Sequence, residues 1–96
     1  MKTGGMVTTS EALARLTERA GAITRQLFAQ SIRPLMVRRG DAERHGKTWL
    51  YREGSLGPWG EYLRARRERV RSGEWARTRP YSLEDFSGIT SKEDRQ

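Results

Sequence analysis

Residues 10–32 read SEALARLTERAGAITRQLFAQSI, and this stretch decides the expected fold. The spacing of its apolar residues predicts a helix over about residues 10–20 that begins near Ser10 and stops at Gly21. A second apolar set predicts a helix over about residues 22–31, because Pro34 is expected to forbid its continuation. Helix, short glycine-containing turn and helix form the outline of a helix-turn-helix, an outline that any two-helix hairpin shares.

After Pro34 the apolar pattern changes to short runs. Residues 35–37 (LMV) and 48–51 (TWLY) are apolar, the second being rich in strand formers, and the ten residues between them are polar and charged. We expect a β-hairpin with a long basic tip. Because two strands alone are marginally stable, the hairpin should lean on the helices through the ring of Trp49 or Tyr51.

A third helix is expected over about residues 58–72, with Pro58 in its first turn. Its apolar positions, including Trp59 and Leu63, form one stripe, and its arginines form another. Since the apolar stripe thins out after Leu63, residues 64–71 are expected to project as an exposed cationic helix. The predicted fold class is mainly α with a small β-hairpin, an α+β arrangement.

The predicted domain organisation has three parts. Residues 1–6 are Gly- and Thr-rich and are expected to be a disordered lead. Residues 7–72 form the domain. Residues 73–96 are expected to be a flexible or partner-docking tail, because this segment is polar and acidic at its end but holds several large apolar side chains. The candidates for protein contacts in this tail are Trp75, Tyr81, Leu83 and Phe86.

Length and composition exclude several classes of protein. The chain has 96 residues, of which 34% are hydrophobic, so its core is small and a large-cleft enzyme is not expected. It has no cysteine and a single histidine, His45, which excludes a thiolate zinc site and a histidine pair. We expect no metal, no cofactor and no catalytic residue. With no apolar run of roughly 18 residues, we also expect no membrane span, and a cytoplasmic, nucleoid-associated protein of a bacterium or phage.

Positive charge dominates most of the chain. The net charge is +7; residues 1–79 hold 17 Lys or Arg against eight Asp or Glu, whereas residues 80–96 hold two against four. Of the 19 basic residues 16 are Arg, whose guanidinium group suits forked contacts with phosphate and guanine. This charge pattern favours phosphate recognition. The alternative is that arginine solvates the surface of a small basic protein, or reflects GC-rich codons.

The order helix, helix, hairpin, helix resembles the winged helix-turn-helix proteins of the MerR-like and excisionase-like group, which includes phage excisionases and small terminase subunits. The residues that carry this resemblance are Thr8-Thr9-Ser10-Glu11-Ala12, Thr24-Arg25-Gln26, Arg33-Pro34-Leu35, Arg38-Arg39-Gly40, Trp49-Leu50-Tyr51, and the packing positions Leu56, Trp59, Tyr62 and Leu63. The resemblance covers about residues 7–66. The chain departs from the group at residues 17–21, which lengthen the passage between the first two helices.

The resemblance implies that the second helix enters the DNA major groove and that the hairpin acts as a wing on the backbone or in the minor groove. Arginine would then pair with guanine and glutamine with adenine. Thr24 has the second interpretation of a helix cap. The expected DNA-binding residues are Thr24, Arg25, Gln26, Arg33, Arg38, Arg39, Arg44, Lys47, Arg64 and Arg67.

The expected function is sequence-specific binding of double-stranded DNA, as a transcriptional regulator or a recombination directionality factor. A module this small favours a homo-oligomer or a cooperative assembly on DNA, and a recombinase or polymerase is the expected protein partner. Two alternatives stay open. The arginine-rich helix could bind structured RNA, or the basic surface could contact an acidic protein, as in a phage-encoded inhibitor.

Overall fold

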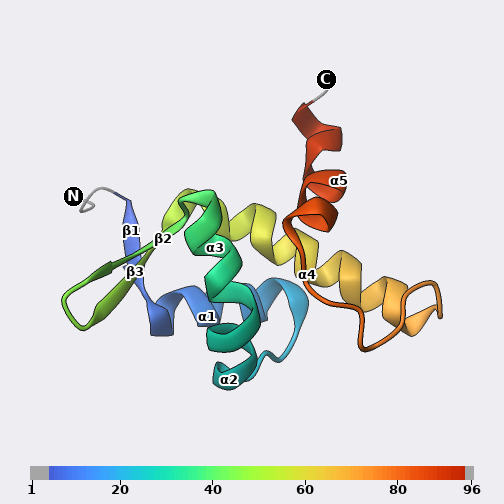
Figure 1. Ribbon diagram of the computed structural model, residues 1–96, viewed down its shortest axis with the longest axis horizontal. Coiled ribbons are helices and arrows are strands. Elements are labelled where there is room, and N and C mark those ends of the chain that lie inside the picture. The colour runs from blue at the N-terminus through green and yellow to red at the C-terminus, as the bar shows by residue number, and fades with distance from the viewer. Residues whose placement is uncertain (1–4, 95–96) are drawn as a thin grey trace.

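The computed structural model describes residues 5–94, with side chains described for residues 5–89. The described part is mainly helical with a small antiparallel sheet, which confirms the predicted class (Figure 1). The elements are β1 (Met6–Thr8), α1 (Thr9–Ala20), α2 (Arg25–Leu27), the π-helical segment η1 (Phe28–Ile32), α3 (Arg33–Arg39), β2 (Ala42–His45), β3 (Thr48–Arg52), the 3-10 turn η2 (Glu53–Ser55), α4 (Leu56–Arg71) and α5 (Leu83–Asp94).

Helix α1 forms close to where its apolar spacing places it. The Thr8 hydroxyl caps it by accepting the Glu11 N–H at 3.3 Å, slightly before the expected start near Ser10, and Gly21 ends it. Its buried residues, Ala12, Leu16 and Ala20, lie four apart on one face. Helix α1 packs most extensively against α4, so these two helices form the centre of the fold.

The prediction that Pro34 ends the second helix is wrong. Helical structure continues from Arg25 through η1 and α3 to Arg39. The turn before the proline is π-helical, with the Arg33 N–H donating to the Phe28 carbonyl, and this wider turn accommodates a residue that lacks an N–H. The run 35–37, expected to be a strand, therefore extends the helix, and Leu35 and Met36 continue the buried face that Phe28 begins.

The expected long basic tip is instead a tight hairpin. Gly40, at φ 84°, ends α3, and strand β2 lies inside the segment predicted as loop. In the register of the two strands His45 faces Thr48, so Gly46 and Lys47 alone form the connection. Gly46 has φ 67°, which is the positive φ that a type II′ turn requires at its first central position.

A third strand, which the sequence did not predict, completes the sheet in the order β1-β3-β2. Met6 of this strand falls in the predicted disordered lead, of which residues 1–4 lie outside the described residues. Tyr51 of the central strand pairs with Val7 on one side and Ala42 on the other. Its ring is fully buried against Phe28, with ring centroids 5.3 Å apart, which confirms the expected anchor of the hairpin.

Helix α4 confirms the third predicted helix and carries the aromatic half of the core. Trp59 and Tyr62 are fully buried and Leu63 nearly so. Gly60 allows α1 to approach, because a Cβ at this position would collide with the Arg19 side chain. The described helices include none that is long and apolar enough to span a membrane.

The segment after residue 72, expected to be a flexible or partner-docking tail, packs against the rest of the chain. Figure 1 shows it turning back after α4 and leading to α5, which stands against α4. Phe86 is 2% exposed and stacks on Trp59 with ring centroids 4.2 Å apart. The physical reason is aromatic burial: Trp59 and Tyr62 would be open to water without α5.

The other three residues proposed for protein contacts are also engaged within the chain. The Trp75 ring lies near the guanidinium groups of Arg69 and Arg79, at 5.0 and 4.1 Å from its centroid. Tyr81 and Leu83 are half-buried and pack against the core cluster. These side chains therefore complete the domain in the described structure.

The role of α5 can be tested with Phe86→Ala. We expect this substitution to lower the free energy of unfolding by about 3–4 kcal/mol, since it removes a buried ring from an aromatic stack. Urea denaturation measures the change. Ser87→Ala, at an exposed position of the same helix, is the control; equal stability of the two variants would mean that α5 does not belong to the core.

Stability should also depend on the Arg79–Asp85 pair. Two hydrogen bonds from the guanidinium, of 3.0 and 2.9 Å, lower the pKa of Asp85 below its ordinary 3.8. Since the folded-state pKa is depressed, this stabilisation is present above pH 3.8 and is lost as the pH falls through the folded-state value. Asp85→Asn should therefore be less stable than the wild type at about pH 7. The difference in the free energy of unfolding between the two should shrink towards about pH 2. Glu84→Gln, at the neighbouring exposed position, should show no such shrinking difference.

Candidate nucleic-acid interface

The turn between α1 and α2 is held by an arginine of α4. Gly21 has φ 97°, a conformation that favours glycine, and a Cβ there would force the Arg67 guanidinium to shift. The Arg67 Nη2 donates to the carbonyl oxygen of Ala22 at 2.9 Å. Arg67 was predicted to bind DNA, but the structure places its guanidinium group on the turn that sets the direction of α2.

The first turn of α2 presents two polar side chains to solvent. Thr24 is the helix cap, its hydroxyl accepting the Leu27 N–H at 3.0 Å, which is the second of its two interpretations. Arg25 and Gln26 are exposed. The Arg25 Nη2 lies 3.5 Å from the Ser10 hydroxyl, and no carboxylate of the described residues pairs with it. This arrangement exposes a guanidinium without a carboxylate partner and an amide at the start of a helix, where both can contact a ligand.

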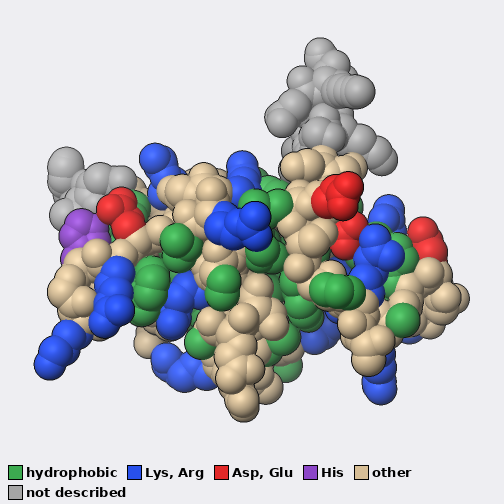
Figure 2. Space-filling view, viewed as in Figure 1, with side chains coloured by type: hydrophobic (Ala, Val, Ile, Leu, Met, Phe, Trp, Pro, Cys, Tyr) green, Lys and Arg blue, Asp and Glu red, His purple; other side chains and the backbone are tan. Residues whose placement is uncertain are grey.

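The hairpin carries two further exposed cations near its turn. The Arg44 Nε donates to the Gly46 carbonyl at 3.0 Å, which fixes the side chain along the turn. Lys47 occupies the turn itself and is exposed. The neighbouring His45 faces the Glu43 carboxylate at 3.2 Å. Figure 2 shows Lys and Arg side chains projecting at the hairpin end of the molecule.

Arg33 was expected to contact DNA but lies half-buried between α3 and β3. Its Nε donates to the Tyr51 hydroxyl at 3.0 Å, and its guanidinium lies 4.8 Å from the centroid of the Trp49 ring. The same Tyr51 hydroxyl lies 3.0 Å from the Thr9 hydroxyl at the start of α1. One phenol group thus joins the sheet to two helices, a role that the sequence analysis missed and that an alternating strand pattern does not reveal.

The two arginines at the end of α3 differ in their surroundings. Arg38 is exposed and makes no hydrogen bond or ion pair within the described part of the chain. Arg39 pairs with Asp41 at 3.3 Å and lies over the Phe86 ring at 4.3 Å. The carboxylate of Asp41, which is buried, also accepts the Trp59 Nε1 hydrogen bond at 2.9 Å. Arg39 therefore helps to fix α5, and Arg38 remains free.

The expected cationic stripe of α4 is largely neutralised. Arg64 pairs with Glu61 and Arg71 with Glu68, both at 3.1 Å and three residues apart. Arg66, inside the same arginine-rich run, is 6% exposed. Ion pairs of this exposed type contribute little to stability, but they reduce the positive potential of the helix. Among the predicted DNA-binding residues, Arg64 thus has a partner within its own helix.

Within residues 21–54, five exposed cations have no carboxylate partner among the described residues. We call them the uncompensated cations. They lie on α2, at the end of α3 and on the hairpin: Arg25, Arg38, Arg44, Lys47 and Arg52. A cation without a neighbouring anion can neutralise a phosphate at the lowest cost, because no existing pair has to be broken.

Comparisons with known proteins identify no relative: the chain matches no protein-family model, no curated protein and no solved structure. Within the described residues there is also no group of three or more His, Asp or Glu side chains that could hold a metal ion. The site must therefore be interpreted from its own geometry and charge.

The hydrogen bonds of the Tyr51 hydroxyl to Thr9 and Arg33 can be tested by substitution. Tyr51→Phe should lower the free energy of unfolding by about 1–2 kcal/mol, because it leaves Arg33 and Thr9 without their partner. Thermal or urea denaturation measures the change. Tyr81→Phe is the matched control, since the Tyr81 hydroxyl makes no hydrogen bond to the described residues. A larger destabilisation in the control would contradict the bridging role.

Proposed function

We propose that this protein binds double-stranded DNA sequence-specifically as a winged helix-turn-helix module. The first turn of α2 would enter the major groove, and the β2–β3 hairpin would contact the backbone or the minor groove. The role in the cell would be that of a transcriptional regulator or an excisionase-like recombination directionality factor. The proposal rests on this chain's own features, in particular the order α1, connection, the continuous helical run α2–η1–α3, hairpin, α4.

One observation carries the proposal: Arg25 and Gln26 lie exposed at the start of α2, directly after the connection from α1. Side chains at the start of a recognition helix are those that meet base edges. Arginine can donate two hydrogen bonds to guanine, and glutamine can pair with adenine. Thr24, as the cap of the same turn, fixes their position through the Leu27 N–H. The pair can therefore supply sequence preference.

The uncompensated cations would supply the affinity that does not depend on sequence. Five phosphates neutralised by these side chains predict that log K falls with log salt concentration at a slope of about −4 to −5. A single small module buries only about 600–1,000 Å² on DNA. We therefore propose that it acts as a homo-oligomer or as a cooperative array on repeated sites, with a recombinase or polymerase as a further partner.

The alternative of RNA binding depended on the arginine-rich stretch of α4. In this stretch Arg64 and Arg71 are paired with glutamates, Arg67 donates to the turn, and Arg66 is buried. Few guanidinium groups of this helix are thus available for a nucleic acid. This distribution favours DNA contact through α2 and the hairpin over RNA contact through α4.

The proposal separates two kinds of variant. Replacing Arg25 and Gln26 together by Ala should reduce the preference for a selected duplex over a scrambled one. Each side chain that pairs with a base should contribute about 1–3 kcal/mol to this loss. Lys47→Ala should weaken binding to all duplexes alike and reduce the salt slope by about one. Selection from a random duplex library, followed by gel-shift titration at several salt concentrations, gives both measurements.

Arg71→Ala is the control for both variants, since it removes a cation that is already paired with Glu68. It should leave affinity and preference nearly unchanged. If the three variants behave alike, or if structured RNA binds as tightly as the selected duplex, the proposed recognition helix is wrong. Isolation of a stable complex with an acidic protein that excludes DNA would favour the inhibitor alternative.

A further inference from the structure

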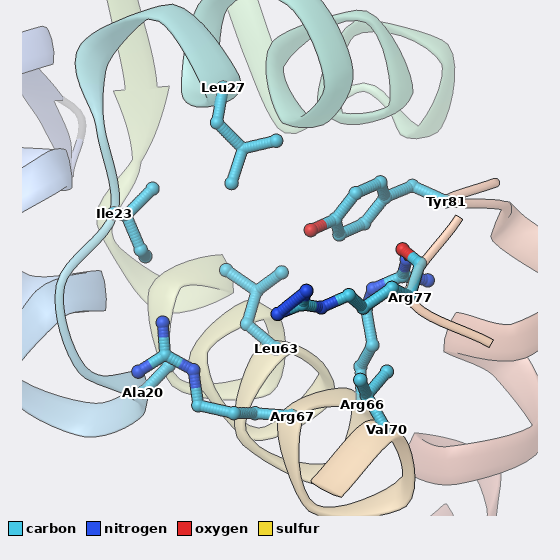
Figure 3. A pocket seen from close by; sticks show the side chains of 9 residues that line it. All are labelled: Ala20, Ile23, Leu27, Leu63, Arg66, Arg67, Val70, Arg77 and Tyr81. Carbon is cyan, nitrogen blue, oxygen red and sulfur yellow. The ribbon is translucent and has the colours of Figure 1, made fainter. Parts of the chain in front are cut away.

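A pocket separate from the uncompensated cations lies where the α1–α2 turn, α2, α4 and the segment before α5 meet. Its volume is about 190 Å³. Figure 3 shows Ile23, Leu27 and Leu63 facing one another across it, with the Tyr81 ring on the side of the returning segment. Ala20 and Val70 complete the apolar part of the lining. The apolar walls can accommodate a hydrocarbon body.

The remaining wall of the pocket is cationic. Arg66, Arg67 and Arg77 all line it, and no carboxylate of the described residues does. The Arg67 guanidinium is engaged by the Ala22 carbonyl. The side chain of Arg77 makes no hydrogen bond or ion pair within the described part of the chain, although its carbonyl oxygen accepts from Arg66. The pocket thus combines an apolar body with an excess of positive charge.

Arg66 is the residue that marks this pocket as a ligand site. It is 6% exposed, its Nη2 donates to the carbonyl oxygens of Arg77 and Arg79, and its guanidinium lies 3.8 Å from the Tyr81 ring centroid. Its Nη1 is buried without a hydrogen-bond partner among the described residues. A buried guanidinium nitrogen without a hydrogen bond is costly, so an acceptor bound beside it would relieve an existing penalty.

We propose that this pocket binds a small organic carboxylate with an aromatic or aliphatic body. Its carboxylate would accept hydrogen bonds from Arg66 and Arg77, and its body would lie among Ile23, Leu27 and Leu63. The size agrees with this class of ligand, because an apolar cavity of about 150 Å³ holds a benzene molecule. The site is independent of the proposed DNA binding, and benzoate is a suitable probe.

The experiment is a titration of the isotope-labelled full-length protein with sodium benzoate, followed by amide NMR. Resonances of Ile23, Leu27, Leu63 and Tyr81 should shift together, with a dissociation constant on the order of 1 mM, since so small a ligand makes few contacts. Benzyl alcohol and inorganic phosphate are the comparators, because each provides one half of the ligand. Either should bind at least about tenfold more weakly, since binding needs the charged contact and the apolar contact together.

Arg77→Ala tests the cationic wall without touching the core, since this side chain is exposed. It should weaken benzoate binding by about three- to tenfold, as expected when one charged interaction is removed from a partly exposed site. Arg71→Ala makes the same change of charge away from the pocket and should leave binding unchanged. Arg66→Met removes the buried charge; if it folds, it should bind benzyl alcohol at least as well as benzoate.

Three results would overturn the proposal. Equal binding of benzyl alcohol and benzoate would make the site a simple apolar cavity, and equal binding of inorganic phosphate would make it a general anion site. Equal weakening by Arg77→Ala and Arg71→Ala would reduce the effect to overall charge. An absence of shifts at the pocket residues up to about ten times the expected dissociation constant would mean that the pocket takes no such ligand.

Discussion

The architecture depends on a buried carboxylate, that of Asp41, which is 7% exposed. Its carboxylate accepts the Trp59 Nε1–H at 2.9 Å and pairs with Arg39, while its backbone N–H donates to Met36 and its carbonyl accepts from Arg52. One residue therefore joins the end of α3, the last residue of β3 and the first turns of α4. Because Trp59 and Arg39 both contact the buried carboxylate, removal of either side chain leaves a charge that the interior solvates less well. The position of the hairpin relative to the helices follows from this junction.

The charge of the chain is divided between arginines that have partners within the fold and cations that have no carboxylate partner among the described residues. Arg39 is held by Asp41 and by α5, Arg67 is held on the α1–α2 turn, and Arg66 is buried beneath Tyr81. These guanidinium groups position backbone and rings: Arg66 is buried, and Arg39 and Arg67 are exposed but already hold a partner within the chain. The uncompensated cations lie elsewhere, on α2, at the end of α3 and on the hairpin. Net charge along the sequence therefore overstates the cationic surface of α4. It also does not show that Arg25 has no carboxylate partner among the described residues.

The sequence predicted the elements that depend on local spacing, and failed where distant contacts decide. The α1 and α4 helices follow from their apolar stripes, and the cap at Thr24 was one of the two interpretations of that residue. Pro34 misled because a π-helical turn, which no residue pattern signals, accommodates it. The Tyr51 hydroxyl bridges to partners 18 and 42 residues away in the sequence. Phe86 packs on rings 24 and 27 residues away. Local periodicity does not encode such pairings.

The arginine excess has a structural cause beside any affinity for phosphate. With 34% hydrophobic residues the chain has little aliphatic material for a core, and guanidinium groups lie within 6.0 Å of aromatic ring centroids at several places. A planar guanidinium can stack on a ring while it donates hydrogen bonds in its own plane, as Arg66 does to two carbonyl oxygens; a lysine ammonium cannot. Arginine thus replaces part of the missing apolar packing around Phe28, Trp49, Trp75 and Phe86. The arginines proposed to contact DNA are therefore those that the fold leaves exposed and without a carboxylate partner among the described residues.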